Sequence, residues 1–162
     1  MVGEKPKILI VSNYHSEETF AIRVGEYLFQ NNSNPEIKVV RYAGKPDRKT
    51  STYNLRRFIE NFDPVISPII LHGDDDLGID VAIVYCAKSK SEKMLARKPL
   101  FDFVSNYGGL IVYGRFLTFN TKCSLIELEL NSKIGSLQRT VDFVKSFSEY
   151  LIDLYSNRGV KL

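Results

Sequence analysis

The stretch KILIVSNYHSEETF, residues 7–20, sets a buried strand directly before a polar turn and the start of a helix. Residues 7–11 are an unbroken run rich in β-branched side chains, which is typical of a strand buried on both faces. Apolar residues recur at helical spacing from Phe20 to Leu28, so the sequence predicts an amphipathic helix over residues 18–30. A strand that passes straight into a helix is the beginning of a β-α-β unit and indicates a parallel sheet.

The same alternation of strands and helices continues along the chain. Pro68 argues against unbroken pairing in one of these strands, because proline has no N–H to donate to a ladder. The pattern predicts a three-layer α/β/α sandwich around a mixed, largely parallel sheet, with residues 1–162 forming a single domain. Further strands are expected at 37–42, 65–72, 80–86, 109–114 and 123–130, and further helices at 53–62, 89–104 and 134–155.

The composition is that of an ordinary soluble globular protein, with 44% hydrophobic and 25% charged residues. The net charge of +3 comes from 22 basic and 19 acidic residues, which are scattered and do not form the clustered basic face that nucleic acid requires. No apolar run reaches the ~18–20 residues of a membrane span, and residues 1–7 lack the apolar core of a signal peptide. The sequence therefore predicts a cytoplasmic protein without a nucleic-acid or membrane partner, and it is compatible with a homo-oligomer.

The two histidines of the chain both stand at the ends of predicted strands. His15 comes just after the first strand, and His72 closes the strand 65–72. Binding sites of open α/β sheets lie beyond the carboxyl ends of the strands, so this is the edge at which two histidines can meet. A buried structural histidine is the commoner role for either residue alone. Their paired placement favours a shared site.

His15 is followed three residues later by Glu18, with Glu17 between them. On a helix, positions i and i+3 share a face and positions i and i+2 do not. His15 and Glu18 can then reach one ion together, while Glu17 serves the first helical turn, where acids are favoured. Two imidazoles and one carboxylate form a His₂Glu set, a common ligand set of catalytic zinc that leaves one position for water. These residues predict a zinc site made by His15, Glu18 and His72.

A hydrolytic metal site also needs a general base near the attacking water. In residues 123–130 the side chains alternate, so that Ile126 and Leu128 face one side of the strand and Glu127 and Glu129 the other. Such a polar strand face is commonly exposed to solvent. An acid flanked by aliphatic residues in an α/β core, as Glu127 is, instead indicates a raised pKa and a catalytic role.

In combination these segments resemble the zinc carboxypeptidase superfamily, and within it the aspartoacylase and succinylglutamate desuccinylase branch. The resemblance covers about residues 7 to 131 and implies the fold of these enzymes, zinc held by His15, Glu18 and His72, and Glu127 as base and proton shuttle. It also implies hydrolysis of an amide bond next to a free carboxylate, in a peptide or an N-acyl amino acid. The matching pieces are His15-Ser16-Glu17-Glu18, then Asp63-Pro64 running into Leu71-His72-Gly73, and Leu125-Ile126-Glu127-Leu128.

Members of this family hold the carboxylate of the substrate with an Asn-Arg pair between the first two ligand segments. This chain has Asn54-Leu55-Arg56-Arg57 in that region, with Leu55 inserted. The resemblance therefore implies Asn54, with Arg56 or Arg57, as substrate-binding residues, and a guanidinium fork suits a carboxylate. The two arginines fit an exposed helix face equally well, and nothing in the sequence separates them.

Two other functions fit parts of the sequence. Residues 11–19, VSNYHSEET, have the Ser/Thr-rich character of a flavodoxin-like loop that holds phosphate or flavin at a helix N-terminus. Glu17 and Glu18 would repel such an anion, and glycines for close approach are missing. The chain is also shorter than typical members of the zinc family, which is compatible with a non-catalytic α/β domain used for binding or assembly.

Overall fold

The computed structural model describes residues 5–12, 18–42, 51–108, 112–118, 123–133 and 136–162. These residues form six strands and four helices, which alternate along much of the chain as expected. The strands are β1 (Ile8–Ser12), β2 (Ile37–Arg41), β3 (Ile69–Gly73), β4 (Val81–Ala87), β5 (Val112–Thr118) and β6 (Leu125–Leu130). The helices are α1 (Thr19–Asn31), α2 (Ser51–Glu60), α3 (Lys90–Asn106) and α4 (Leu137–Arg158).

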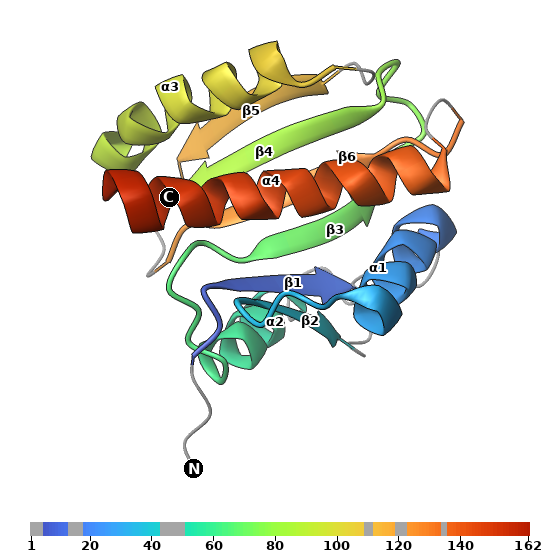
Figure 1. The fold of residues 1–162 in the computed structure, drawn as a ribbon, viewed down its shortest axis with the longest axis horizontal. Coiled ribbons are helices and arrows are strands. Elements are labelled where there is room, and N and C mark those ends of the chain that lie inside the picture. The colour runs from blue at the N-terminus through green and yellow to red at the C-terminus, as the bar shows by residue number, and fades with distance from the viewer. Residues whose placement is uncertain (1–4, 13–17, 43–50, 109–111, 119–122, 134–135) are drawn as a thin grey trace.

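The strands form one sheet in the order β2-β1-β3-β6-β4-β5 (Figure 1). Neighbouring strands from β2 to β6 run parallel, β4 runs antiparallel to β6, and β5 runs parallel to β4. The expected mixed and largely parallel sheet is confirmed. The carboxyl ends of β1, β3 and β6 consequently meet at one edge of the sheet, the edge at which α/β proteins place their sites.

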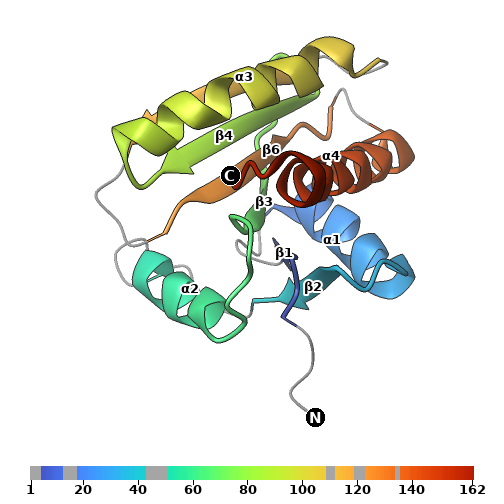
Figure 2. The ribbon, with the colours of Figure 1, turned by 60° about the vertical axis from the view of Figure 1, so that its left-hand side comes forward.

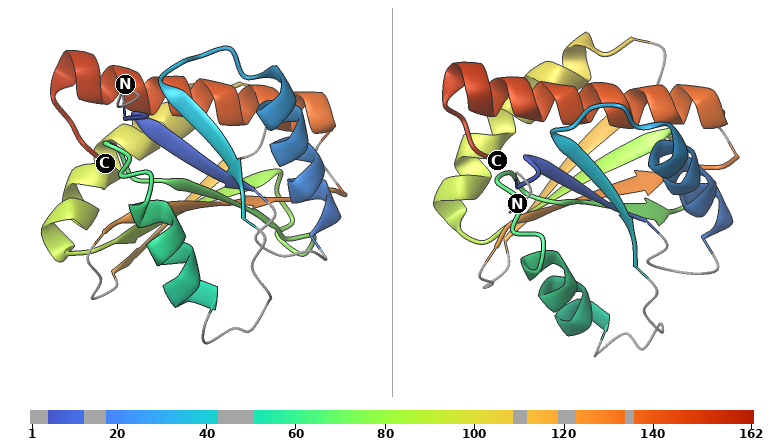
Figure 3. Two further views of the ribbon diagram at one scale, coloured as in Figure 1. Left: turned by 90° about the horizontal axis from the view of Figure 1, so that it is seen from below. Right: turned by 60° about the horizontal axis from the view of Figure 1, so that its bottom comes forward.

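Helices cover both faces of the sheet, as the three-layer prediction requires (Figures 2 and 3). Side chains of α1, α3 and α4 pack with one set of strand residues, and those of α2 pack with the other set. Successive side chains of β3 point to opposite faces of the sheet. Leu71 packs in the core formed with α1, α3 and α4, and Ile70 packs in the core formed with α2. His72, two residues after Ile70, therefore lies on the face of the sheet that α2 covers.

Two prolines shape the elements differently from a simple reading of the sequence. β3 begins at Ile69, so Pro68 precedes the strand and β3 can occupy the centre of the sheet. The carbonyl of Pro68 still accepts the N–H of Ile126 at 2.9 Å. α3 continues through Pro99, although proline has no N–H to donate to a helical hydrogen bond. The carbonyl of Pro99 accepts the hydroxyl of Tyr150 at 2.8 Å, so a side chain of α4 contacts α3 at this point.

A glycine sets the distance between α1 and β1. A Cβ atom built on Gly25 would lie 1.9 Å from Oγ of Ser12, a separation that no side chain tolerates. Glycine at this position lets α1 lie directly against the carboxyl end of β1. The start of α1 reaches the end of β3 as well, where Gly73 lies against Glu18.

None of the helices in the described part of the chain combines the length and the apolar composition that crossing a bilayer requires.

Candidate functional site

Three of the predicted site residues converge at the carboxyl edge of β3 and β6. His72 is the penultimate residue of β3, and its side chain is only 10% exposed. Its Nδ1 atom lies 3.5 Å from Oε2 of Glu18, and its Nε2 atom lies 3.7 Å from Oε1 of Glu127. The backbone N–H of Gly73 donates to Oε2 of Glu18 at 3.0 Å. The edge of the sheet thus sets one imidazole between two carboxylates.

β6 brings its acids to His72 because it lies beside β3 in parallel register. Glu127 pairs with Ile70, and Glu129 pairs with His72 itself. Residues that pair across parallel strands point to the same face, so both glutamates share the face of His72. The predicted alternation along residues 123–130 is confirmed, with the intervening aliphatic side chains in the core.

The cluster perturbs two pKa values. Burial acts to lower the pKa of His72, but the hydrogen bond with Glu18 and the charges of Glu127 and Glu129 outweigh it and raise that pKa above its usual value. Burial, opposed by His72 and reinforced by Glu127, raises the pKa of Glu129 to about 7. The carboxyl on this strand whose pKa is strongly raised is therefore Glu129, whereas the sequence directed attention to Glu127.

The spacing of His72 and Glu18 suits two ligands of one zinc ion. Zinc bonds of 2.0–2.2 Å at the tetrahedral angle set two ligand atoms roughly 3.3–3.5 Å apart. The distance from Nδ1 of His72 to Oε2 of Glu18 is 3.5 Å. The part of the chain that the structure describes contains no group of three or more His, Cys, Asp or Glu able to hold a metal. A zinc site here needs a further ligand, and His15, predicted for that place, lies outside the described ranges.

The helix predicted over residues 18–30 corresponds to α1, which begins at Thr19 with Glu18 as its N-cap residue. Glu18 therefore precedes the first helical turn. The contact with Gly73, and not the helix face, sets the position of the Glu18 carboxylate. His15 and Glu17 are outside the described residues, and the role of His15 as a ligand stays a prediction.

The acidic run after β3 organises the turn beside the site. Oδ1 of Asp74 accepts the N–H of Asp76 at 2.9 Å. Oδ1 of Asp75 accepts both the N–H and the hydroxyl of Ser132, at 2.9 and 2.6 Å, and these bonds lower the pKa of Asp75. The Asp75–Ser132 hydrogen bonds join the turn after β3 to the turn after β6. No local pattern in the sequence predicts this contact. A cavity of about 200 Å³ beside it is lined by Glu18, Thr19, Phe20, Gly73, Asp75 and Ser132.

α2 carries the predicted substrate-binding residues. Leu55 is buried in the core under this helix, so the residue inserted into the Asn-Arg pair has a packing role. Asn54 and Arg57 are exposed, and Arg56 is half-buried. The Nε atom of Arg56 is buried without a hydrogen-bond acceptor among the described residues. Burial thus distinguishes Arg56 from Arg57, and no ion pair between described residues joins Arg56 to the His72 cluster.

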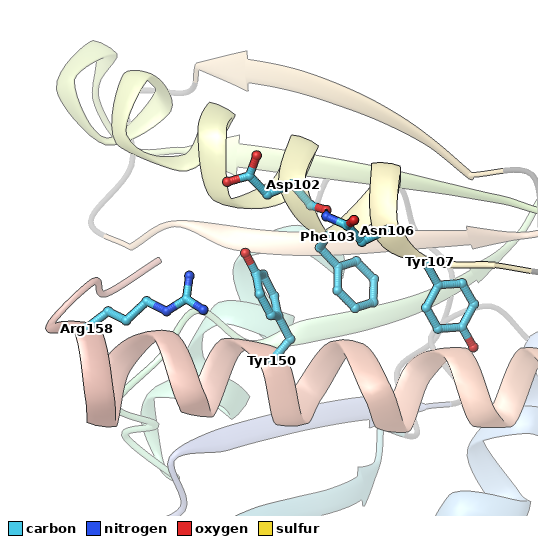
Figure 4. Close-up of a pocket in the computed structure, with 6 residues that line it drawn as sticks. All are labelled: Asp102, Phe103, Asn106, Tyr107, Tyr150 and Arg158. Atoms are coloured by element: carbon cyan, nitrogen blue, oxygen red, sulfur yellow. The ribbon is translucent and has the colours of Figure 1, made fainter.

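A separate groove lies between α3 and α4, on the other face of the sheet from His72 (Figure 4). Its volume is about 330 Å³, and its aromatic walls belong to the packing between the two helices, with the rings of Phe103 and Tyr150 centred 5.0 Å apart. The sheet separates this groove from the His72 cluster. It is lined by Asp102, Phe103, Asn106, Tyr107, Tyr150 and Arg158.

No protein-family model and no curated protein matches this chain in sequence comparisons. The class of site is therefore defined by the fold and the geometry alone. The described residues place one imidazole, His72, between the carboxylates of Glu18 and Glu127 at the carboxyl edge of parallel strands, where α/β proteins place their sites.

Proposed function

We propose that this protein is a zinc-dependent hydrolase that cleaves an amide bond next to a free carboxylate. The observation that carries the proposal is the 3.5 Å separation between Nδ1 of His72 and Oε2 of Glu18 at the carboxyl edge of β3. In this proposal His15 completes the ligand set with Glu18 and His72. Bound zinc supplies an activated water and polarises the carbonyl of the substrate.

Glu127 is the residue that we propose as base and proton shuttle. Its side chain is 33% exposed, so its carboxylate is accessible from solvent while it lies beside His72. From this position it accepts a proton from the attacking water and donates it to the leaving amine. General acid–base catalysis of this kind contributes about 10²–10⁴-fold to the rate.

The substrate carboxylate is assigned to Asn54 together with Arg56 or Arg57. Arg56 is the better candidate of the two arginines, because its buried Nε has no acceptor among the described residues. Peptides with a free C-terminus and N-acyl amino acids share the required carboxylate. We propose a cytoplasmic location for the activity, as the sequence predicts.

A non-catalytic α/β binding or assembly domain is the second candidate. It is favoured by one observation, that the described residues alone do not complete a metal-ligand set. A flavodoxin-like phosphate site is disfavoured by the contact between Glu18 and the N–H of Gly73. That carboxylate already occupies a backbone donor at the edge where a phosphate would bind, and its charge repels the phosphate.

The proposal is tested with protein purified without a histidine tag. It should contain zinc in equimolar amount and hydrolyse at least one N-acyl amino acid, and chelation should abolish the activity until zinc is restored. Protein that neither contains nor binds zinc, and that turns over none of these compounds, would favour the binding domain. A yellow protein would instead indicate flavin.

A further inference from the structure

Large apolar side chains are exposed mainly on one helix. Met94, Leu95 and Phe101 of α3 are 64%, 63% and 69% exposed, although the helix has a fully buried side of its own. Among the described residues the other large hydrophobic residue with high exposure is Phe29, which is 44% exposed and has the guanidinium of Arg41 4.1 Å from its ring centre. Met94 and Phe101 therefore form an apolar surface on the outside of α3 that the fold itself does not use, whereas Leu95 lines a separate cavity.

Cationic side chains surround these residues on the same helix. At 100° per residue, Met94 and Phe101 lie above one another two turns apart. Lys98 lies about 40° to one side of Met94, and Lys90 lies about 20° beyond Phe101 on the opposite side. Both lysines are exposed. Arg97 and Lys93 lie on the same side as Lys90, where Arg97 is exposed and Lys93 is half-buried. The outside of α3 thus has an apolar centre with cations on both flanks.

The acids of α3 cancel only part of this charge. Asp102 is ion-paired with Lys98 at 2.8 Å, and Glu92 is held by Lys88 at 3.0 Å and by the hydroxyl of Ser124. Lys90 and Lys93 form no ion pair with any residue in the described ranges. The outer surface of the helix is left with net positive charge.

We propose that this surface, the α3 face, binds the surface of an anionic lipid membrane. Helices that lie in a membrane interface carry a central apolar stripe flanked by Lys and Arg, whose stems lie on the apolar surface while their charged ends reach the head groups. Figures 1 and 2 show α3 running along the outside of the molecule, where a flat surface can approach it. The α3 face consists of Lys90, Lys93, Met94, Arg97, Lys98 and Phe101.

Other occupants explain fewer of these features. A second copy docked through the same face about a twofold axis would set the cations of one copy against those of the other. An acidic protein would satisfy the cations, but it would need a pocket to receive Met94 and Phe101. A lipid interface accepts protruding apolar side chains without a preformed pocket. This proposal departs from the expectation of no membrane partner drawn from the sequence, which rested on the lack of a long apolar run and of a signal-peptide core.

The test is sedimentation with vesicles of phosphatidylcholine alone and of phosphatidylcholine containing phosphatidylserine. The protein should bind the anionic vesicles and not the neutral ones, and binding should weaken as salt is added. Met94→Ser combined with Phe101→Ser should weaken partitioning at least about tenfold. Lys90→Ser combined with Lys93→Ser should weaken it by about fivefold for each charge removed.

Matched controls separate this surface from general effects. Phe29→Ser removes an exposed ring from α1, and Lys133→Ser combined with Arg139→Ser removes two exposed charges near the start of α4. Both should retain nearly full vesicle binding, and thermal unfolding should show that every variant is folded. The proposal is overturned if the wild-type protein ignores anionic vesicles or if control and α3 variants lose binding equally. Binding to polyglutamate but not to vesicles, lost in the α3 variants, would also overturn it and assign the face to an acidic protein.

Discussion

Oε2 of Glu18 lies 3.5 Å from Nδ1 of His72 and accepts the backbone N–H of Gly73, so one carboxylate oxygen faces two consecutive residues at the end of β3. The hydrogen bond to the backbone fixes this oxygen independently of any metal ion. In the proposed zinc site this contact would preorganise the Glu18 carboxylate as a ligand.

The first prediction concerns the ligand set. Glu18→Gln and His72→Ala should each weaken zinc binding by more than about 100-fold. Losing a residue that only hydrogen-bonds a metal ligand typically costs about 10–100-fold in metal affinity. Glu17→Gln removes the same charge one residue away and should retain the metal. The measurement is the zinc-to-protein ratio after dialysis against limiting zinc. Full zinc content in His72→Ala would show that the ligand assignment is incorrect.

The second prediction separates the two glutamates of β6. Glu127→Gln should keep its zinc and lose about 10²–10⁴-fold in turnover, because the amide keeps the size of the side chain and removes the base. Glu129→Gln should cost far less. The assay is zinc content and hydrolysis rate of both variants with the same N-acyl amino acid.

A different result for Glu127 has a specific structural meaning. Glu127 lies on the Nε2 side of His72, whereas Glu18 lies on the Nδ1 side. A carboxylate at Nε2 can orient the ring of a metal-binding histidine, and losing it typically costs about 10–100-fold in metal affinity. If Glu127→Gln lowers zinc affinity to this degree and retains its turnover when saturated with zinc, Glu127 orients His72 and is not the base.

The third prediction concerns the carboxylate of the substrate. Arg56→Ala should raise KM for N-acyl amino acids about 10–100-fold, the effect of losing a hydrogen bond to a charged group. It should leave the already weak binding of the corresponding methyl esters unchanged. Arg57→Ala is the matched control and should have a small effect. Equal turnover of the free acids and the esters by the wild-type protein would remove the carboxylate clamp from the proposed function.

The fourth prediction concerns the contact between α1 and β1. Gly25→Ala should destabilise the protein by about 1–3 kcal/mol, because overpacking against Ser12 outweighs the gain of about 1 kcal/mol in helix propensity. Gly108→Ala is the control, since a Cβ atom there has no other atom within 4 Å. Urea unfolding of both variants measures the difference. A more stable Gly25→Ala protein would mean that the contact relaxes at little cost.

The fifth prediction is a pH dependence of stability at Glu92. Burial acts to raise the pKa of Glu92, but hydrogen bonds from Ser124 and Lys88 outweigh it, so the pKa is lowered from its ordinary value of 4.5. A carboxylate with a lowered folded-state pKa stabilises the fold at pH values above 4.5, and this contribution is lost as the pH falls through the folded-state pKa. Glu92→Gln should therefore be about 1 kcal/mol less stable than wild type at pH 7, and the difference should shrink below pH 4.5.

The control for Glu92 is Glu149→Gln, which removes one exposed carboxylate from α4. Its stability relative to wild type should change little between pH 7 and pH 4. Urea unfolding at both pH values measures each variant. A Glu92→Gln deficit that persists unchanged at pH 4 would mean that packing, and not the charge of Glu92, is responsible.

Much of the fold is predictable from the sequence because hydrophobic periodicity is a local property of the chain. The run at residues 7–11 corresponds to β1, and the alternation in residues 123–130 corresponds to β6 with Glu127 and Glu129 on one face. Some observed boundaries differ from the predicted ones by a few residues. β3 begins after Pro68, and Glu18 occupies the N-cap position of α1 instead of lying within the helix.

The sequence by itself determined the order and type of the elements, and it set His72 near a strand end and two acids on one face of a later strand. Only the tertiary structure decided that β6 lies beside β3, which brings Glu127 and Glu129 to His72. It also decided that burial raises the pKa of Glu129 to about 7. Strand order and burial depend on how whole faces of helices and sheets pack together, and no local pattern of residues contains that information.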